Sequence, residues 1–111
     1  MSSFTEDKLI LVLHNLGIPS HLKGYIYLKE AIIIYEEQCL ITKSVYRYLA
    51  NKYNKSVSSI ERAIRNAIEI GCLRSDFIFF EELFGASINA DNGKPTNLQF
   101  IATVKEQLKI I

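Results

Sequence analysis

Residues 42–71, TKSVYRYLANKYNKSVSSIERAIRNAIEIG, decide the predicted fold. Thr42 is expected to cap a short helix, and Ser56 to cap a second helix that ends before Gly71, because both residue types accept hydrogen bonds from helix-start amides. A turn at Asn54 separates the two helices. Two short helices joined by a turn of a few residues are typical of a helix-turn-helix.

Three positions in this stretch support the helix-turn-helix on steric grounds. Ala50 is small where the second helix must cross the first, and Ile60 can fill the space between them. Asn54 lies in the turn, where a left-handed backbone is needed, and Asn tolerates that conformation best after Gly. The same pattern occurs in ordinary helical hairpins, so it favours a helix-turn-helix without defining one.

The second of these helices, about residues 57–70, has two opposed faces. At about 100° per residue, its apolar stripe, which is expected to be buried, comprises Ile60, Ile64, Ala67 and Gly71. The opposite side and its flanks carry Ser58, Ser59, Glu61, Arg62, Arg65, Asn66 and Glu69. Arg can pair with guanine through two hydrogen bonds, Asn with adenine, and Glu can accept from cytosine. The alternative is a solvated helix face on which Glu61 and Arg65 form an ion pair.

The charge distribution favours DNA over the solvated face. The whole chain has a net charge of +1, but residues 43–74 contain seven basic and two acidic residues, a net +5. The segments on either side each carry −2. Positive charge is therefore concentrated where DNA phosphates would lie, and the expected phosphate contacts are Lys43, Arg47, Lys55, Ser56 and Ser58.

The rest of the chain predicts further helices and no strands. Residues 3–6 and 96–99 both have the capping-box pattern of a helix start. Ser20 is expected to begin a helix that runs to about residue 37, with Leu22, Ile26, Ile33 and Ile34 available for the core. Residue 75 or 76 should begin a short helix ending at Gly85, followed by a polar loop over 86–94. The sequence thus predicts one all-α domain over residues 1–111, with six helices and a helix-turn-helix.

Several classes of protein are excluded by what the sequence lacks. A chain of 111 residues with 49% hydrophobic and 23% charged residues is typical of one globular domain. It has no run of about 18 apolar residues for a membrane span, no signal peptide and no catalytic motif. Cys39 and Cys72 are expected to be reduced core thiols, and His14 and His21 lack partners at metal-ligand spacing. We therefore expect a cytoplasmic protein that is not an enzyme and binds no metal or cofactor.

Four ordered blocks of the sequence resemble the C-terminal effector domain of the sporulation master response regulator, stage zero sporulation protein A. The blocks are GIPSHLKGY at 17–25, YLKEAI at 27–32, IERAIRNAIE at 60–69 and KPTN at 94–97. The resemblance runs from about Leu16 to Leu108 and implies a six-helix domain whose fourth helix enters the major groove of double-stranded DNA. It also implies a head-to-tail homodimer on paired DNA sites and contact with the RNA polymerase sigma subunit.

The resemblance also implies which residues contact DNA bases and the sigma subunit. The family's base-contacting positions correspond to Ser59, Glu61, Arg62, Arg65 and Asn66. Ser59 stands where the family has an arginine and Asn66 where it usually has a histidine, so the family's usual DNA site need not apply here. The sigma-contacting surface maps to about residues 75–88, and its candidate contacts are Phe79, Phe84 and Ile88. Within it, the helical spacing of Phe77, Phe80 and Phe84 is typical of core, whereas Phe79 falls off that stripe.

Two functions follow from the sequence. The first is a sequence-specific DNA-binding transcription regulator related to sporulation. The second is a protein-interaction module that modulates the full-length sporulation regulator, or occupies its sigma-factor contact, without contacting DNA. Family members carry a receiver domain that this chain lacks, so we expect either an excised domain or a free-standing paralogue. The departures at Ser59 and in the fifth helix favour the paralogue.

Overall fold

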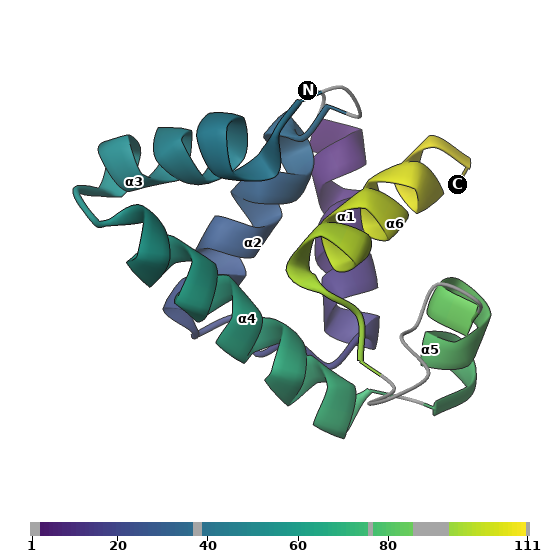
Figure 1. Ribbon diagram of the computed structural model, residues 1–111. Helices are drawn as coiled ribbons and strands as arrows, with labels where there is room; N and C mark the ends of the chain where they lie inside the picture. Colours follow the sequence, from purple (N-terminus) through teal and green to yellow (C-terminus); the bar gives the residue numbers. More distant parts are fainter. Residues whose placement is uncertain (1–2, 37–38, 76, 86–93, 111) are drawn as a thin grey trace.

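A computed structural model of the chain describes residues 3–36, 39–75, 77–85 and 94–110. Within these residues it has six α-helices, one π-helical turn and no β-strand (Figure 1). The elements are α1 (Ser3–Asn15), α2 (Lys23–Ile34), η1 (Ile41–Tyr46), α3 (Arg47–Tyr53), α4 (Val57–Arg74), α5 (Phe77–Phe84) and α6 (Asn97–Ile110). The predicted all-α fold with a helix-turn-helix is confirmed. Nowhere in the described ranges is there a helix both long and apolar enough to cross a membrane.

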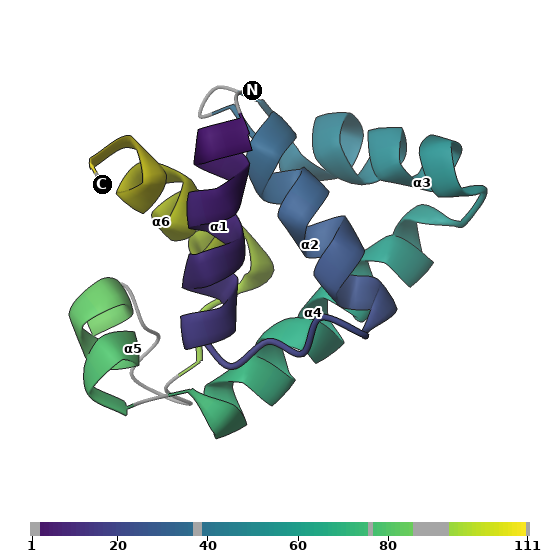
Figure 2. The same ribbon diagram turned by 180° about the vertical axis from the view of Figure 1, so that it is seen from behind.

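The helices α3 and α4 diverge from a common turn at one edge of the molecule (Figure 1). Seen from behind, α1 and α2 lie next to each other and form the face of the domain that is turned toward the viewer (Figure 2). The most extensive contact between two helices is that of α2 with α4, and α6 contacts α1, α2, α4 and α5. This arrangement covers one side of α4 and leaves its other side free.

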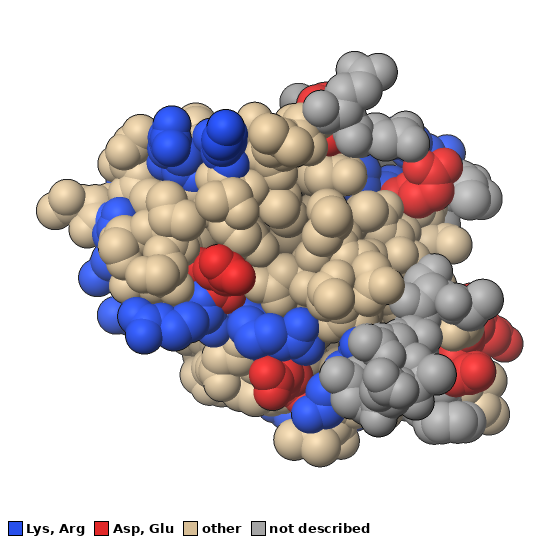
Figure 3. Space-filling view, viewed as in Figure 1, with Lys and Arg blue, Asp and Glu red and all other residues tan. Residues whose placement is uncertain are grey.

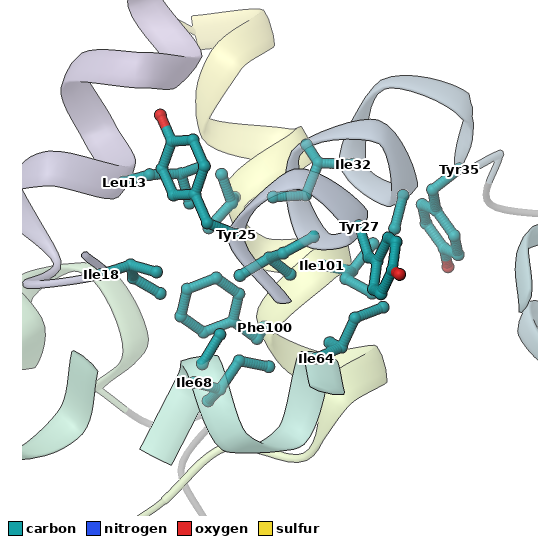
Figure 4. Packing of buried hydrophobic residues seen from close by; sticks show 14 of the residues in the cluster. Leu13, Ile18, Tyr25, Tyr27, Ile32, Tyr35, Ile64, Ile68, Phe100 and Ile101 are labelled. Atoms are coloured by element: carbon teal, nitrogen blue, oxygen red, sulfur yellow. The ribbon is translucent and has the colours of Figure 1, made fainter. Parts of the chain in front are cut away.

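The core between these helices is apolar throughout the described residues, among which no polar or charged residue is buried. Figure 4 shows Ile68 of α4 beside the ring of Phe100 of α6, and Ile64 of α4 nearer to Tyr27 of α2. The Phe100 ring also stacks on Phe84 of α5, with ring centroids 5.2 Å apart. These contacts hold α4 to the body of the domain through one face, as its sequence pattern predicts.

A glycine permits the close crossing of α2 and α4. A Cβ atom at Gly24 would lie 2.1 Å from the Ala63 carbonyl oxygen and 3.0 Å from the Ala67 Cβ. Because the opposing oxygen is part of the backbone of α4, it cannot move away as a side chain would. Gly24 and the small residues opposite it therefore set the distance between the two helices.

The prediction for the second helix is wrong in its start, its end and its buried face. Ser20 lies in a turn closed by the Leu22 amide and the Pro19 carbonyl, and α2 runs only from Lys23 to Ile34. The close approach of Gly24 to α4 fixes the rotation of α2, so its buried residues are Gly24, Tyr25, Tyr27, Leu28, Ala31 and Ile32. Ile26, expected in the core, is 45% exposed, while Leu22, Ile33 and Ile34 are only partly buried.

Two further helix boundaries differ from the sequence prediction. Thr42 does not cap a helix, because it lies inside the π-helical turn η1, which begins at Ile41 after an uncapped Leu40. Gly71 does not end α4, which continues to Arg74. The glycine instead allows a close contact, since a Cβ atom there would lie 2.8 Å from the Leu16 carbonyl oxygen.

Other predicted helix ends are confirmed. The Thr96 hydroxyl accepts from the Gln99 amide at 3.0 Å, and the Gln99 side chain accepts from the Thr96 amide at 2.8 Å. This reciprocal pair is the predicted capping box of α6. The helix α5 starts at Phe77 and ends before Gly85, close to the expected bounds. The predicted polar loop falls, but for Lys94, outside the described residues.

Candidate nucleic-acid interface

The turn between α3 and α4 has the predicted left-handed residue. Asn54 has φ 55° and ψ 50°, and its amide donates to the Ala50 carbonyl. The next amide, of Lys55, donates to the same carbonyl at 2.9 Å. Ala50 and Ile60 are both buried, as their predicted places between the helices require. The two helices thus form a helix-turn-helix joined by a tight, hydrogen-bonded turn.

Three serines, Ser56, Ser58 and Ser59, lie around the start of α4. The Ser56 hydroxyl accepts from the Ser59 amide at 3.1 Å and donates to the Ser59 hydroxyl at 2.9 Å. The Ser58 hydroxyl lies 3.3 Å from that of Ser56 and is exposed. Ser56 is therefore the helix cap that the sequence predicts. Ser59, one of the predicted base-contacting residues, takes part in this cap and is only partly exposed.

The two faces of α4 are separated as predicted. Every residue of the predicted apolar stripe is buried, and Ile68 joins it. On the opposite side, Glu61, Arg62 and Asn66 are exposed. The side chain of Arg62 has no hydrogen bond or ion pair to any residue that the structure describes, so all five of its N–H donors are available to a ligand.

Arg65 differs from Arg62 in being held by other parts of the protein. Its Nε donates to Glu69 Oε1 at 3.2 Å, and its Nη1 donates to the Pro95 carbonyl oxygen at 2.9 Å. Nη1 also lies 3.4 Å from Asn97 Oδ1, and the side chain is 31% exposed. The sequence suggested Glu61 as the ionic partner of Arg65, but the structure pairs Arg65 with Glu69, one turn further on.

These contacts limit how Arg65 can bind a base. A guanidinium pairs with guanine through two neighbouring nitrogens, either Nε with Nη2 or Nη1 with Nη2. Each pair includes one nitrogen that already bonds the protein, and only Nη2 has no partner among the described residues. Arg65 as placed here therefore offers one nitrogen to a base, whereas Arg62 offers the complete fork.

The polar face of α4 forms one wall of a groove of about 540 Å³. The wall from α4 comprises Ser58, Glu61, Arg62 and Arg65. The other walls come from η1 (Ile41, Thr42, Tyr46) and from the start of α6 (Thr96, Asn97, Leu98). No role at this site was predicted for the start of α6, although its KPTN sequence at 94–97 is one of the four blocks that carry the family resemblance.

Basic side chains surround this face. In Figure 3, Lys and Arg side chains gather along α4 and over α3, with few Asp or Glu side chains among them. Lys43, Arg47 and Lys55 are exposed and bond no described residue. Lys52 is different, because Glu30 of α2 accepts hydrogen bonds from both Lys52 and Tyr53. The free positive charge is therefore smaller than the count in the sequence, but it lies on the predicted face.

The residues predicted for a sigma-factor contact do not form one exposed surface. Phe84 is 1% exposed and packs on Phe80 and Phe100, so it belongs to the core. Phe79 is partly buried against the core, and Ile88 lies outside the described residues. Among the α5 side chains that the structure describes, the exposed large apolar one is Ile78, with 67% of its area accessible, which the helical spacing of the phenylalanines did not suggest.

The cysteines and histidines form no site in the described residues. Cys39 and Cys72 are free thiols, both partly buried, and burial raises the pKa of the Cys72 thiol. His14 and His21 are exposed. Within the described ranges, no three His, Cys, Asp or Glu side chains come together as a metal site would require.

An all-α domain with a helix-turn-helix, whose second helix carries a free arginine amid exposed basic residues, belongs to the class of DNA-binding regulatory domains. Comparison with known families then identifies the particular one. The family model described as "Sporulation initiation factor Spo0A C terminal" matches residues 9–108, nearly the whole chain, and the chain belongs to this family. The Spo0A C-terminal domain is the DNA-binding effector domain of a sporulation regulator, and its family is regulatory rather than a known enzyme family.

Proposed function

We propose that this chain is a sequence-specific, DNA-binding transcription regulator related to sporulation control, in which α4 enters the major groove of double-stranded DNA. The observation that carries the proposal is the exposed, unpartnered Arg62 on the polar face of α4. A basic side chain without an internal partner loses no protein contact when it binds a base, which makes it the strongest candidate for recognition.

The neighbours of Arg62 extend the base-contacting surface. Glu61 and Asn66 are exposed on the same helix and supply an acceptor for cytosine and a bidentate partner for adenine. Arg65 contributes through Nη2 alone. Ser59 is largely used by the helix cap, so its contribution is weaker than that of the arginine found in the family.

Phosphate contacts come from both helices of the helix-turn-helix. Lys43 and Arg47 lie in η1 and at the start of α3, and Lys55 lies in the turn. Ser56 and Ser58 lie beside it at the start of α4, where the helix dipole also favours a phosphate. Such contacts fix the register of the protein on DNA without carrying sequence information.

Membership of the family supports three finer proposals. The first is a homodimer on paired DNA sites, and the second is contact with the RNA polymerase sigma subunit. On α5 that contact would use Ile78 in place of the buried Phe84. The third is a cytoplasmic location, because a DNA-binding domain of this family must reach chromosomal DNA. The protein-interaction module is the rival outcome of the test below.

Binding to DNA tests the proposal. The wild-type protein selects duplexes from a pool with a randomised core, and its Kd for the selected duplex is compared with that for a scrambled one. The Arg62→Ala variant should lose roughly 1–3 kcal/mol of this discrimination, the value of one good bidentate base contact. The Lys43→Ala variant should weaken binding to both duplexes alike and lower the salt dependence by about one released counterion.

The matched control is Lys109→Ala, which removes one exposed charge near the end of α6, outside the helix-turn-helix. It should leave discrimination unchanged. The proposal fails if wild type and Arg62→Ala bind selected and scrambled DNA equally well. A stable protein partner, combined with no salt-dependent affinity for DNA, would support the protein-interaction module instead.

A further inference from the structure

Asn97, the first residue of α6, joins three elements around the polar face of α4. Its Nδ2 donates to the Tyr46 hydroxyl of η1 and to the Glu61 carbonyl oxygen of α4, both at 3.2 Å. Its Oδ1 lies 3.4 Å from Arg65 Nη1. Both N–H donors of the Asn97 amide and its acceptor oxygen therefore face other elements of the site.

The segment that carries Asn97 is itself held in place. Pro95 is buried and has a ring-restricted backbone, and its carbonyl oxygen accepts from the same Arg65 Nη1 at 2.9 Å. Thr96 and Gln99 form the capping box described above, which fixes the first turn of α6. Arg65 Nη1 thus binds two oxygens of a segment with little freedom to move.

A held arginine binds a base differently from a free one. A long side chain normally loses rotamer freedom on binding, which opposes association. The contacts of Arg65 with Glu69, Pro95 and Asn97 already restrict that freedom in the free protein, and Nη2 remains without a described partner. Part of the rotamer freedom that Arg65 would lose on binding a base is therefore already lost in the free protein.

We propose that Asn97 is a positioning residue for base recognition, which acts by holding Arg65 so that its Nη2 is presented to the DNA. The inference rests on the proposed function, because it concerns the same helix and the same ligand. Asn97 itself contacts no base. It sets the orientation of a residue that does, and so contributes to sequence specificity from the start of α6.

A merely structural role for Asn97, fastening α6 to α4, predicts a different dependence on Arg65. If Asn97 only fastens the helices, its removal affects DNA binding whether or not Arg65 is present. If it acts through Arg65, its effect on specificity disappears once Arg65 is replaced. A double-mutant cycle between these two positions separates the two explanations.

The experiment measures Kd for the selected and the scrambled duplex and takes their ratio as the specificity. Wild type is compared with Asn97→Ala, Arg65→Ala and the double variant. Asn97→Ala should lower the specificity roughly 2- to 12-fold, the cost of ordering one long side chain. The double variant should have the same specificity as Arg65→Ala alone.

Two further variants keep the test independent of folding. Gln99→Ala breaks the capping box of the same turn without touching Arg65, and should lower stability but not specificity. Asn97→Asp keeps an oxygen for Arg65 Nη1 and places an acid at a helix start, which is tolerated, so it should retain most of the specificity. Far-ultraviolet circular dichroism and urea unfolding confirm that each variant is folded.

Three results would overturn the inference. They are an unchanged specificity in folded Asn97→Ala, an equal loss of specificity with and without Arg65, and tighter binding of the selected duplex by Asn97→Ala. The last result would mean that the contact with Asn97 hinders Arg65 from binding its base. In each case wild type still discriminates between the duplexes, so the proposed function stands. If wild type itself shows no discrimination, the proposed function fails and the inference fails with it.

Discussion

Replacing Gly24 by alanine is expected to destabilise the domain, because no space exists for a Cβ atom where α2 crosses α4. That atom would lie 2.1 Å from the Ala63 carbonyl oxygen, 2.8 Å from the Ala63 carbonyl carbon and 3.0 Å from the Ala67 Cβ. Ordinary contacts between such atoms are at about 3.5–4.0 Å. The two helices must therefore move apart by more than about 1 Å to relieve the overlap.

The expected loss follows from two opposing terms. Overpacking a close-packed core costs typically about 1–3 kcal/mol, and the upper end applies here because a backbone atom opposes the new methyl group. Alanine in a helix is favoured over glycine by about 1 kcal/mol, which offsets part of this cost. The Gly24→Ala variant should thus lose about 2 kcal/mol of unfolding free energy, which lowers the Tm of a domain of this size by roughly 9 °C.

Urea unfolding followed by circular dichroism measures this loss directly. The matched comparison is Gly71→Ala, where the nearest atom, the Leu16 carbonyl oxygen, would lie 2.8 Å from the new Cβ. Its destabilisation should be smaller than that of Gly24→Ala. The reasoning is refuted if Gly24→Ala unfolds at the same or a higher urea concentration than wild type with an unchanged m-value.

Three further predictions concern the helix-turn-helix and its surroundings. Ser56→Ala should lower the unfolding free energy by about 0.5–2 kcal/mol because a first-turn amide of α4 loses its acceptor, whereas Ser58→Ala should change the urea midpoint little. Asn54→Ala should be destabilised by about 1 kcal/mol relative to Asn54→Gly in the same assay, since alanine disfavours φ 55°. Burial raises the pKa of the Tyr46 hydroxyl, opposed by its hydrogen bond from Asn97, so the unfolded chain loses this proton first as the pH rises above about 10. The stability that the protonated Tyr46 hydroxyl contributes is therefore complete below about pH 10 and is lost as the pH rises further. In Tyr46→Phe the unfolding free energy should decline less steeply with rising pH than in wild type. An identical decline would contradict the raised pKa of Tyr46.

The helix-turn-helix could be predicted because its signals are local. The cap at Ser56, the left-handed Asn54 and the apolar stripe of α4 each depend on residues close together in the sequence. Each leaves a specific pattern that the structure confirms. The capping box at the start of α6 is predictable for the same reason.

The features that the sequence predicted wrongly depend on contacts between segments that are far apart in the chain. The buried face of α2 is set by the approach of Gly24 to Ala63, and nothing near Gly24 in the sequence specifies that partner. The π-helical turn has the same residue types as an ordinary helix start. Arg65 belongs to the expected face of α4, but its bond to the Pro95 carbonyl joins residues 30 positions apart, so its reduced availability is visible only in the fold.

The length of α4 has a mechanical consequence. With 18 residues at about 1.5 Å each it is a rod of roughly 27 Å, comparable to the 30 Å shortest dimension of the domain. One end carries the serines beside the turn, and the other passes Leu16 and leads to α5. A tilt of about 10° would displace one end relative to the other by about 5 Å along such a lever, more than the spacing between neighbouring base pairs. If α4 enters the major groove as proposed, the packing at its far end would govern the alignment of the protein on DNA.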